Sequence, residues 1–355
     1  MSGTHTSVAV IELEHSGHRL YFATLLANHL AQEGLDCILV TSPESLESRE
    51  GRENFPYLDK RVQVETWLRS SGIRPCVERY ASDDKWVIVL DGEGLLYQRS
   101  LPRVKSGRVI CMMLHSPNLY PVQPAYSRPF KRALVARGEN SGFRVLSLAS
   151  PSIVLSDRPN TTADPSPFAL LPPFDPDHAR DRLDPNFFWI GLFGGLSRRK
   201  GTKLLIEAVR ESKRHDLALL MVGQWRDTEL RTEVMHLAEE AGIATQIHDQ
   251  FVTTEELRLQ ISRVDQVAVL NRNEGSSGIL LASCALRKPV ILSGSASLYR
   301  EAQALDVSWA NPNPSDLASL LRDQLGKISF PPKYVPAVSG RDFTLPFINL
   351  LRHQV

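Results

Sequence analysis

The stretch Phe188-Trp-Ile-Gly-Leu-Phe-Gly-Gly-Leu-Ser-Arg-Arg-Lys-Gly201 decides the fold of the second half of the chain. Its apolar run over Phe188–Phe193 predicts a buried strand. The two glycines and three cations that follow predict a tight polar turn, and a helix is expected over Gly201–Glu211. A strand that passes through a glycine turn into a helix is the repeating unit of a parallel sheet.

The same alternation of strand and helix continues through both halves of the chain. In the second half, strands are expected at Leu217–Val222, near Gln246–His248, at Gln266–Leu270 and at Pro289–Leu292, with helices over Thr228–Ala241, after Thr253 and over Ser277–Leu286. In the first half, strands are expected at Ser7–Leu13, Cys37–Thr41, Trp86–Leu90 and Val109–Leu114, with shorter candidates at Val145–Leu148 and Ile153–Leu155. The sequence therefore predicts an α/β fold with two Rossmann-like parallel-sheet domains facing each other across a cleft.

A stretch rich in proline and aspartate, Leu171–Asn186, separates the two halves. It has little apolar periodicity, which is typical of a domain boundary, and a length of 355 residues by itself predicts about two domains. We therefore expect an N-terminal domain over residues 1–172, a linker over 173–187, a C-terminal domain over 188–328 and a tail over 329–355.

Composition excludes several classes of protein. The 41 Lys and Arg residues nearly cancel the 40 Asp and Glu residues, a balance that argues against a protein that coats nucleic acid. No apolar run is long enough to span a membrane, and no basic segment precedes the first apolar run, so we expect a cytoplasmic protein without a signal peptide. The four cysteines lack CxxC spacing and indicate reduced core thiols. The histidines lack metal-ligand spacing, so we predict no metal site.

Four stretches of the second half together resemble the nucleotide-binding domain of the GT-B glycosyltransferases, and in particular the retaining group called family 4. The resemblance covers about residues 188–325, and its stretches are Gly194–Gly201, Leu219–Gly223, Phe251–Leu257 and Asn273–Ser293. It implies a GT-B fold in which the second domain binds a nucleotide-sugar donor and the first binds an acceptor. It also implies transfer with retention, without a metal or cofactor, and a tail that packs back on the body of the protein.

The resemblance gives Lys200 the role of binding the donor diphosphate. A cation beside helix amide groups can neutralise a diphosphate without a metal. The arginine that partners this lysine in the family falls at Gly195 here, so Arg198 or Arg199 would have to replace it. The alternative is a helix start that carries ordinary solvated charges.

Glu274 is, by the same resemblance, the catalytic residue that contacts the donor sugar. Ser276, Ser277 and Gly278 follow it, and their small size would let the backbone approach the sugar. A simple capping loop is the alternative. The second glutamate of the family, which bonds the ribose, is replaced by Ala282. This departure implies that other groups hold the ribose, that the donor is unusual, or that activity is lost.

Two polar segments of the first half are candidates for the cleft. His115 ends a buried strand where the family often has a histidine near the reacting sugar, and we expect it to be catalytic; a structural histidine with satisfied hydrogen bonds is the alternative. Gly17, His18 and Arg19 follow the first strand and would contact an acceptor or a phosphate, although polar loops are common there. For Asp91 and Glu93 a tight turn is the favoured explanation.

A locally basic stretch contains Arg128, Lys131, Arg132, Arg137 and Arg144 among apolar residues. A solvated helix face explains it best, and a peripheral contact with anionic lipid at the inner face of the membrane is the alternative.

We therefore expect a glycosyltransferase that moves a sugar from a nucleotide-sugar donor to a glycan, lipid-linked or small-molecule acceptor, with no nucleic acid as partner. The alternatives are a catalytically silent GT-B protein that binds a nucleotide, glycan or partner enzyme, and a GT-B sugar-nucleotide epimerase.

Overall fold

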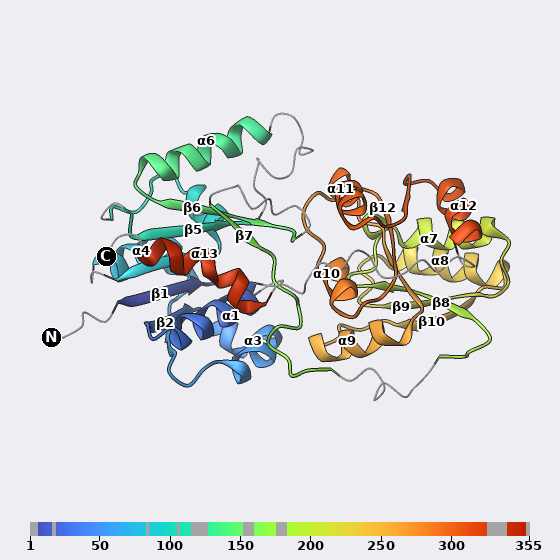
Figure 1. Cartoon of the computed structure of the whole chain (residues 1–355), viewed down its shortest axis with the longest axis horizontal. Coiled ribbons are helices and arrows are strands. Elements are labelled where there is room, and N and C mark those ends of the chain that lie inside the picture. Colours follow the sequence, from blue (N-terminus) through green and yellow to red (C-terminus); the bar gives the residue numbers. More distant parts are fainter. Residues whose placement is uncertain are drawn as a thin grey trace. The chain divides into compact units, whose positions relative to one another are not determined.

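The computed structural model describes residues 6–15, 19–82, 85–104, 107–114, 127–151, 160–174, 183–324 and 339–352. The chain divides into two compact units. Unit 1 contains Met1–Pro165 and Val338–Val355, and unit 2 contains Ser166–Ala337. The predicted linker over 173–187 lies within unit 2 by this division. Each unit is described by itself below (Figure 1).

Unit 1 is built on a seven-stranded sheet in the order β3-β2-β1-β4-β5-β6-β7, in which every pairing is parallel. Its strands are β1 (Ser7–Glu12), β2 (Asp36–Thr41), β3 (Gln63–Thr66), β4 (Trp86–Val89), β5 (Val109–Met113), β6 (Arg144–Ala149) and β7 (Thr161–Ala163). The central strands are apolar and buried along almost their whole length, as expected for a parallel sheet covered on both faces.

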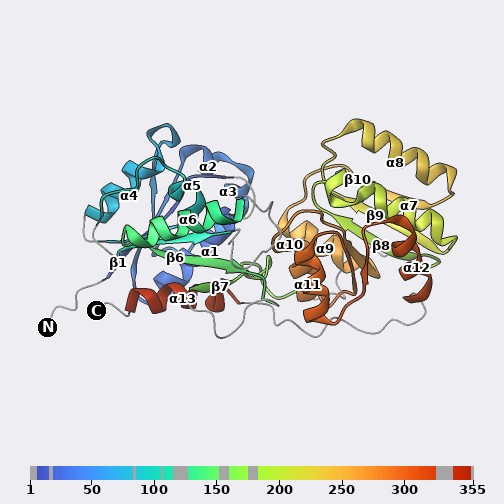
Figure 2. The same ribbon diagram turned by 90° about the horizontal axis from the view of Figure 1, so that it is seen from above.

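Helices cover both faces of this sheet (Figure 2). The helices of this part are α1 (Arg19–Gln32), α2 (Pro43–Glu47), α3 (Arg49–Asn54), α4 (Ile73–Ser82), α5 (Gly92–Leu96) and α6 (Ser127–Asn140). Side chains of α4, α5 and α6 share one core cluster with alternate residues of the strands. Helix α1 packs on β1 and β2 from the other side.

The C-terminal helix α13 (Gly340–Arg352) belongs to unit 1, although the whole of unit 2 separates it from the rest of that unit in the sequence. It packs against α1 and β7, and Phe343 and Phe347 are fully buried. Gly340 allows this approach, because a Cβ atom there would lie 2.5 Å from Nε2 of His29. Helix α13 is thus an integral part of the core of unit 1.

Unit 2 is built on a second all-parallel sheet, with the order β10-β9-β8-β11-β12-β13. Its strands are β8 (Phe188–Phe193), β9 (Leu217–Val222), β10 (Ala244–His248), β11 (Gln266–Val269), β12 (Val290–Ser293) and β13 (Trp309–Ala310). Its helices are α7 (Thr202–Ser212), α8 (Thr228–Glu240), α9 (Thr254–Arg263), α10 (Gly278–Ala285), α11 (Ala296–Leu305) and α12 (Pro314–Gln324). Helices α7, α8 and α12 share one core cluster with the sheet, and α9, α10 and α11 share the other.

The expected α/β class with two Rossmann-like parallel sheets is therefore confirmed. The predicted strand at Val145–Leu148 is β6, whereas Ile153–Leu155 lies outside the described residues. Strand β3 was not predicted, because Gln63-Val-Glu-Thr66 is mostly exposed at the sheet edge and has no apolar run. The four cysteines are buried and free, as the sequence predicted.

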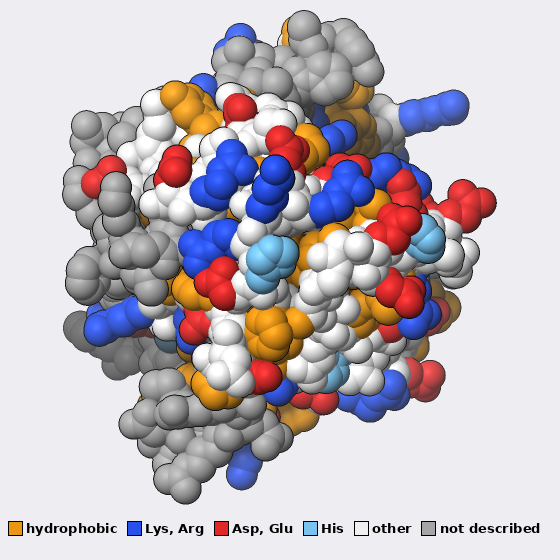
Figure 3. Space-filling view, turned by 90° about the vertical axis from the view of Figure 1, so that its right-hand side faces the viewer, with side chains coloured by type: hydrophobic (Ala, Val, Ile, Leu, Met, Phe, Trp, Pro, Cys, Tyr) orange, Lys and Arg blue, Asp and Glu red, His pale blue; other side chains and the backbone are white. Residues whose placement is uncertain are grey.

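Three further properties concern membranes, metals and surface charge. None of the helices that the structure describes is both long and apolar enough to cross a bilayer. Within the same residues, no three His, Cys, Asp or Glu side chains gather in a metal-binding arrangement. Basic and acidic side chains are intermixed on the face shown in Figure 3.

Candidate functional site

The candidate site lies at the carboxyl edge of the sheet of unit 2, where the strand order changes direction. The chain runs from β8 through β9 to β10, and then returns to β11 on the other side of β8. In open α/β sheets, ligands bind outside the carboxyl ends of the strands at this point. The backbones of the loops pack closely here. A Cβ atom at Gly223, which follows β9, would lie 1.8 Å from the carbonyl oxygen of Gly194, which follows β8.

The loop after β8 carries Lys200 at its end, and we call it the lysine turn (residues 194–201). Residues Arg198–Lys200 form a short 3-10 helix, and Gly201 then adopts a left-handed conformation at φ 73°. A Cβ atom at Gly201 would lie 2.4 Å from Cβ of Leu270, so only glycine fits between the turn and the end of β11. The hydroxyl of Thr202 accepts a hydrogen bond from N–H of Ser197 and donates one to its carbonyl, both at 3.1 Å. The sequence thus holds the lysine turn in one conformation.

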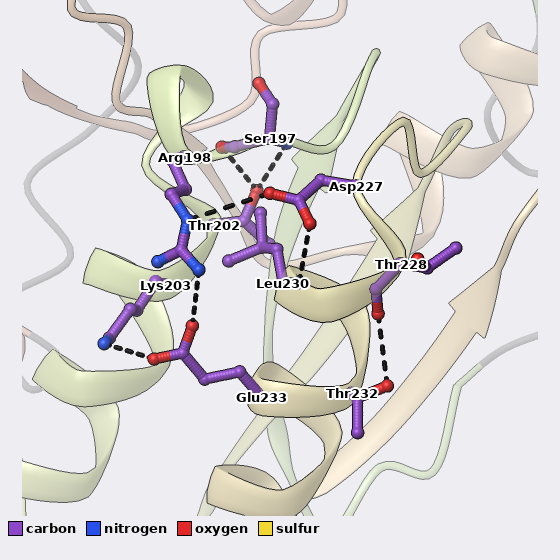
Figure 4. Close-up of polar contacts among 9 residues, drawn as sticks. All are labelled: Ser197, Arg198, Thr202, Lys203, Asp227, Thr228, Leu230, Thr232 and Glu233. Atoms are coloured by element: carbon purple, nitrogen blue, oxygen red, sulfur yellow. Dashed lines mark hydrogen bonds and ion pairs between the residues drawn. The ribbon is translucent and has the colours of Figure 1, made fainter.

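Arg198 forms ion pairs with acidic residues in the first half of α8 and at its N-cap (Figure 4). Its guanidinium lies 2.9 Å from a carboxylate oxygen of Glu233 and 3.7 Å from one of Asp227. Lys203 also pairs with Glu233. Because the charge of Arg198 is already balanced, Arg199 and Lys200 are the cations of the lysine turn that stay candidates for binding an anion.

Lys200 is a half-buried cation without a compensating acid. Neither Lys200 nor Arg199 forms an ion pair with any residue that the structure describes. Burial lowers the pKa of the Lys200 ammonium, and the positive charge of Arg199 lowers it further. Burial of a charge costs free energy unless an opposite charge compensates it. An anion bound at the lysine turn would remove both penalties.

The loop after β11 lies directly against the lysine turn. The N–H of Arg272 donates a hydrogen bond of 3.1 Å to the carbonyl oxygen of Arg199. Glu274 follows two residues later, so the structure brings the loops that carry Lys200 and Glu274 to the same edge of one sheet. A backbone hydrogen bond thus links these two loops within unit 2.

The carboxylate of Glu274 caps the N-terminus of α11. It accepts hydrogen bonds from N–H of Ala296 at 3.1 Å and from N–H of Ser297 at 2.9 Å, and the hydroxyl of Ser297 also donates to it. The N–H of Gly275 in turn donates to the hydroxyl of Ser297 at 2.9 Å. The predicted sugar-binding carboxylate is therefore held in place by a helix N-terminus, an arrangement that sequence alone did not indicate.

The residues after Glu274 form the start of α10. Ser277 is the N-cap, and its buried hydroxyl accepts a hydrogen bond of 3.4 Å from N–H of Leu280. Gly278 is the first helical residue, and Ser276 is partly buried beside it. Ala282 is fully buried in the core between α10 and the sheet. The position of the ribose-binding glutamate of the family thus faces the core of unit 2 here.

Gly195 has open space around it. A Cβ atom built on it would meet no other heavy atom within 4 Å, and its φ is not positive. The position that resembles the family's arginine would therefore accommodate a side chain without a clash.

The candidate residues of unit 1 are only partly described. Gly17, His18 and His115 lie outside the described residues. Arg19 begins α1, and its guanidinium lies 3.0 Å from a carboxylate oxygen of Asp91, which follows β4 and caps α5. Glu93 pairs with Lys131 at 3.6 Å. Asp91 stabilises the turn into α5 by accepting a hydrogen bond of 3.1 Å from N–H of Gly94, which is the favoured explanation from the sequence, whereas Glu93 contacts α6.

One notable side chain of unit 1 was not selected from the sequence. Glu12 ends β1 and is fully buried. Its Oε1 accepts a hydrogen bond of 2.8 Å from N–H of Glu14, and its Oε2 has no hydrogen-bond partner in the described part of the chain. Burial raises the pKa of this carboxyl to about 8. An acid at the end of an apolar strand was the signal that could have identified it.

Comparisons with known proteins give one family match and several similar structures. Residues 175–325 match the family model of the glycosyl transferases group 1. A comparison with curated protein sequences finds no significant match.

Solved structures resemble the chain over nearly its full length. HepE of Anabaena, solved in complex with UDP and glucose, is 13% identical, with a TM-score of 0.62 and coverage of 99% of both chains. The sucrose-phosphate synthase of Thermosynechococcus elongatus is 15% identical, with a TM-score of 0.63 and coverage of 98% of this chain and 95% of that chain. A putative UDP-N-acetylglucosamine 2-epimerase of Listeria monocytogenes is 14% identical, with a TM-score of 0.59 and the same coverage. At this level of identity the likeness shows the fold, which is GT-B.

The chain therefore has the GT-B fold, and most of unit 2 matches the glycosyl transferases group 1.

Proposed function

We propose that this protein transfers a sugar from a nucleotide-sugar donor to an acceptor, with retention at the anomeric carbon and without a metal. The observation that carries the proposal is the half-buried, uncompensated Lys200 beside Arg199, at the carboxyl edge where the strand order of unit 2 reverses. UDP is bound by the structural neighbour from Anabaena, and a UDP-sugar is therefore our first choice of donor.

In this mechanism, the lysine turn stabilises the departing diphosphate. Negative charge grows on the diphosphate oxygens as the bond to the sugar breaks, and pre-positioned cations lower the free energy of that transition state. Arg199 and Lys200 would contact these oxygens. Because both cations repel each other before the donor binds, the bound anion would relieve a strain that the free protein carries.

Glu274 and the start of α10 would hold the donor sugar. The carboxylate of Glu274 would accept hydrogen bonds from sugar hydroxyls while α11 keeps it in place, and Ser276, Ser277 and Gly278 would let the sugar approach the backbone. His115 stays the predicted second catalytic residue, and Gly17, His18 and Arg19 the predicted acceptor contacts, all from the resemblance.

A screen of nucleotide sugars tests the donor. Stabilisation by a bound ligand equals RT ln(1 + [L]/Kd), so a thermal-shift series with UDP, GDP, ADP and TDP sugars should identify one base. Incubation with that donor and candidate acceptors should then give product in EDTA, and the anomeric NMR signal of the product should show retention. An inverted product would contradict transfer with retention. A requirement for metal would contradict the proposal that cations of the protein bind the diphosphate without a metal.

Replacement of Lys200 tests whether this half-buried cation binds the diphosphate. Lys200→Ala should lower kcat about 100- to 1000-fold, as expected for loss of one transition-state charge contact. The melting temperature should stay the same or rise, because the substitution removes a half-buried charge that no acid balances. Arg210→Ala is the matched control, since Arg210 is exposed in the last turn of α7. Unchanged turnover in the Lys200 variant would refute the phosphate role.

Two observations favour a second function, a GT-B protein that binds a nucleotide or glycan without transfer. Gly195 lacks the cation of the family, and Ala282 is buried in the core where the family has a glutamate. Nucleotide binding without product from any donor would establish this alternative. Conversion of the donor sugar in the absence of acceptor would instead identify an epimerase, the activity given for the structural neighbour from Listeria.

We further propose a cytoplasmic location with peripheral contact to the inner face of the membrane through α6. Phe130 of α6 and Tyr97 pack together with ring centroids 5.8 Å apart, and their exposed fractions are 53% and 48%. Arg132 is exposed on the same helix. Arg137 has a structural role instead, since it donates hydrogen bonds to the carbonyls of Leu96 and Arg99.

Vesicle flotation tests this contact. Wild-type protein should bind vesicles that contain anionic lipid and not purely zwitterionic vesicles. Phe130→Ala should reduce binding, whereas Leu259→Ala, which removes an exposed apolar side chain of α9 in unit 2, should not. Equal binding by both variants would exclude α6 as the contact.

A further inference from the structure

The lysine turn lacks one of the cations that its predicted role requires. Gly195 has no side chain at the position where the resemblance places an arginine, and Arg198 is neutralised by Glu233 and Asp227. Only Arg199 and Lys200 remain uncompensated in the turn. A diphosphate carries at least two negative charges and several acceptor oxygens, so a further cation from outside the turn would complete its binding.

Arg272 is placed to supply this cation from the neighbouring strand. It follows β11, which pairs with β8 in the sheet. Its N–H donates to the carbonyl of Arg199 at 3.1 Å, and the preceding Leu270 contacts the lysine turn at Gly201. The backbone of Arg272 is thus fixed against the backbone of the phosphate-binding turn, on the side of β8 that faces β11.

The charge of Arg272 is also uncompensated. Its side chain is exposed and forms no ion pair within the described ranges. The nearest acid in the sequence, Glu274, directs its carboxylate to the N-terminus of α11. Arg199, Lys200 and Arg272 are therefore three cations without acidic partners among the residues that the structure describes, on two loops whose backbones are joined by a hydrogen bond.

We propose that Arg272 is a phosphate-binding residue of the nucleotide-sugar site and replaces the arginine that is missing at Gly195. The proposal rests on the proposed function, because it concerns the same donor. A guanidinium can donate two parallel hydrogen bonds to one phosphate group, so Arg272 would bind the diphosphate from the loop after β11 while Lys200 binds it from the loop after β8.

Calorimetric titration with UDP and with uridine tests the role of Arg272. Arg272→Ala should weaken UDP binding about tenfold, the loss expected for one charge-assisted contact. Uridine binding should not change, because uridine carries no phosphate. Arg210→Ala should bind both probes like the wild type, since α7 starts at the carboxyl edge and Arg210 lies in its last turn at the opposite edge. Arg272 is exposed, so its substitution should leave the melting temperature unchanged.

A second variant relocates the cation. Arg272→Ala combined with Gly195→Arg should recover most of the UDP affinity, because the new arginine occupies the open space at residue 195. If Arg272→Ala binds UDP like the wild type while Lys200→Ala does not, the role of Arg272 is refuted and the proposed function stands. Equal losses for UDP and uridine would also refute a phosphate contact. If the wild type binds no nucleoside diphosphate, the proposed function fails and this inference fails with it.

Discussion

At the scale of single residues, the departures from the family pattern are the most informative positions. Gly195 and Ala282 lie where the resemblance places charged residues, but their surroundings differ. Gly195 faces open space, whereas Ala282 is packed in the core. The first position can therefore be restored by substitution, and the second cannot, because a buried glutamate without partners would destabilise unit 2.

Gly195→Arg alone should strengthen UDP binding about fivefold. A charge-assisted hydrogen bond contributes about 2 kcal/mol, and immobilising an arginine side chain on binding costs about 1 kcal/mol, which leaves a net gain of about 1 kcal/mol. Titration of UDP measures this gain, and Gly195→Ala serves as the control that adds no charge. Weaker binding by the arginine variant would place the diphosphate away from residue 195.

Glu12 makes the stability of unit 1 depend on pH. Burial raises the pKa of its carboxyl from an ordinary value of 4.5 to about 8, so the folded state holds a proton that the unfolded state releases. The stabilising effect is fully present below the unfolded pKa and is lost as the pH rises through about 8. Between pH 5 and 8 the free energy of unfolding should therefore fall by about 2–4 kcal/mol on account of Glu12.

Glu12→Gln checks this dependence, because glutamine has a similar shape and does not titrate. Urea unfolding of wild type and variant at pH 5, 6.5 and 8 should show two curves that diverge as the pH rises, with the variant less sensitive. Parallel curves would show that Glu12 is ionised in the folded protein.

At the scale of elements, Glu274 links the candidate site to the stability of α11. Glu274→Ala should lower the free energy of unfolding of unit 2 by about 1–2 kcal/mol, because it leaves the N–H groups of Ala296 and Ser297 without their acceptor. Glu274→Gln keeps one acceptor oxygen and should lose less. Thermal unfolding of the two variants measures the difference. Equal stability of the wild type and both variants would mean that the carboxylate leaves α11 in solution.

Sequence analysis predicted the elements whose buried residues form continuous apolar runs in the sequence. Strands β1, β2, β8 and β9 are continuous apolar runs, so they could be recognised from the sequence. Strand β3 could not, because its position is decided by pairing with β2 and not by its own exposed side chains.

The same distinction applies to the candidate site. The resemblance selected the loops of Lys200 and Glu274, and the alternation of strands implied that they share one sheet edge. The partners of their side chains could not be predicted, because Glu233 lies 35 residues from Arg198 and Ser297 lies 23 residues from Glu274. Such pairings depend on how helices pack on the sheet, and no local periodicity encodes them.

At the scale of the whole molecule, the chain closes unit 1 with a helix that is synthesised after all of unit 2. Phe343 of α13 packs on Phe22 of α1 and on Phe347, with ring centroids 5.5 and 5.6 Å apart. Its carbonyl accepts a hydrogen bond from the hydroxyl of Thr162 in β7. The core of unit 1 is therefore complete only when both ends of the chain are present, whereas unit 2 is continuous in sequence.

Phe343→Ala should consequently lower the stability of unit 1 and leave the UDP affinity of unit 2 unchanged. Loss of a fully buried phenylalanine should destabilise unit 1 by about 3–5 kcal/mol. Thermal unfolding should then show an earlier transition for unit 1, while the affinity of unit 2 for UDP at low temperature should not change. Leu345→Ala, in the same helix but 44% exposed, should alter neither property. If sugar transfer fails in Phe343→Ala under conditions where UDP still binds, transfer requires a folded unit 1 in addition to the bound donor. Loss of UDP binding together with the unit 1 transition would instead mean that the donor site needs both units.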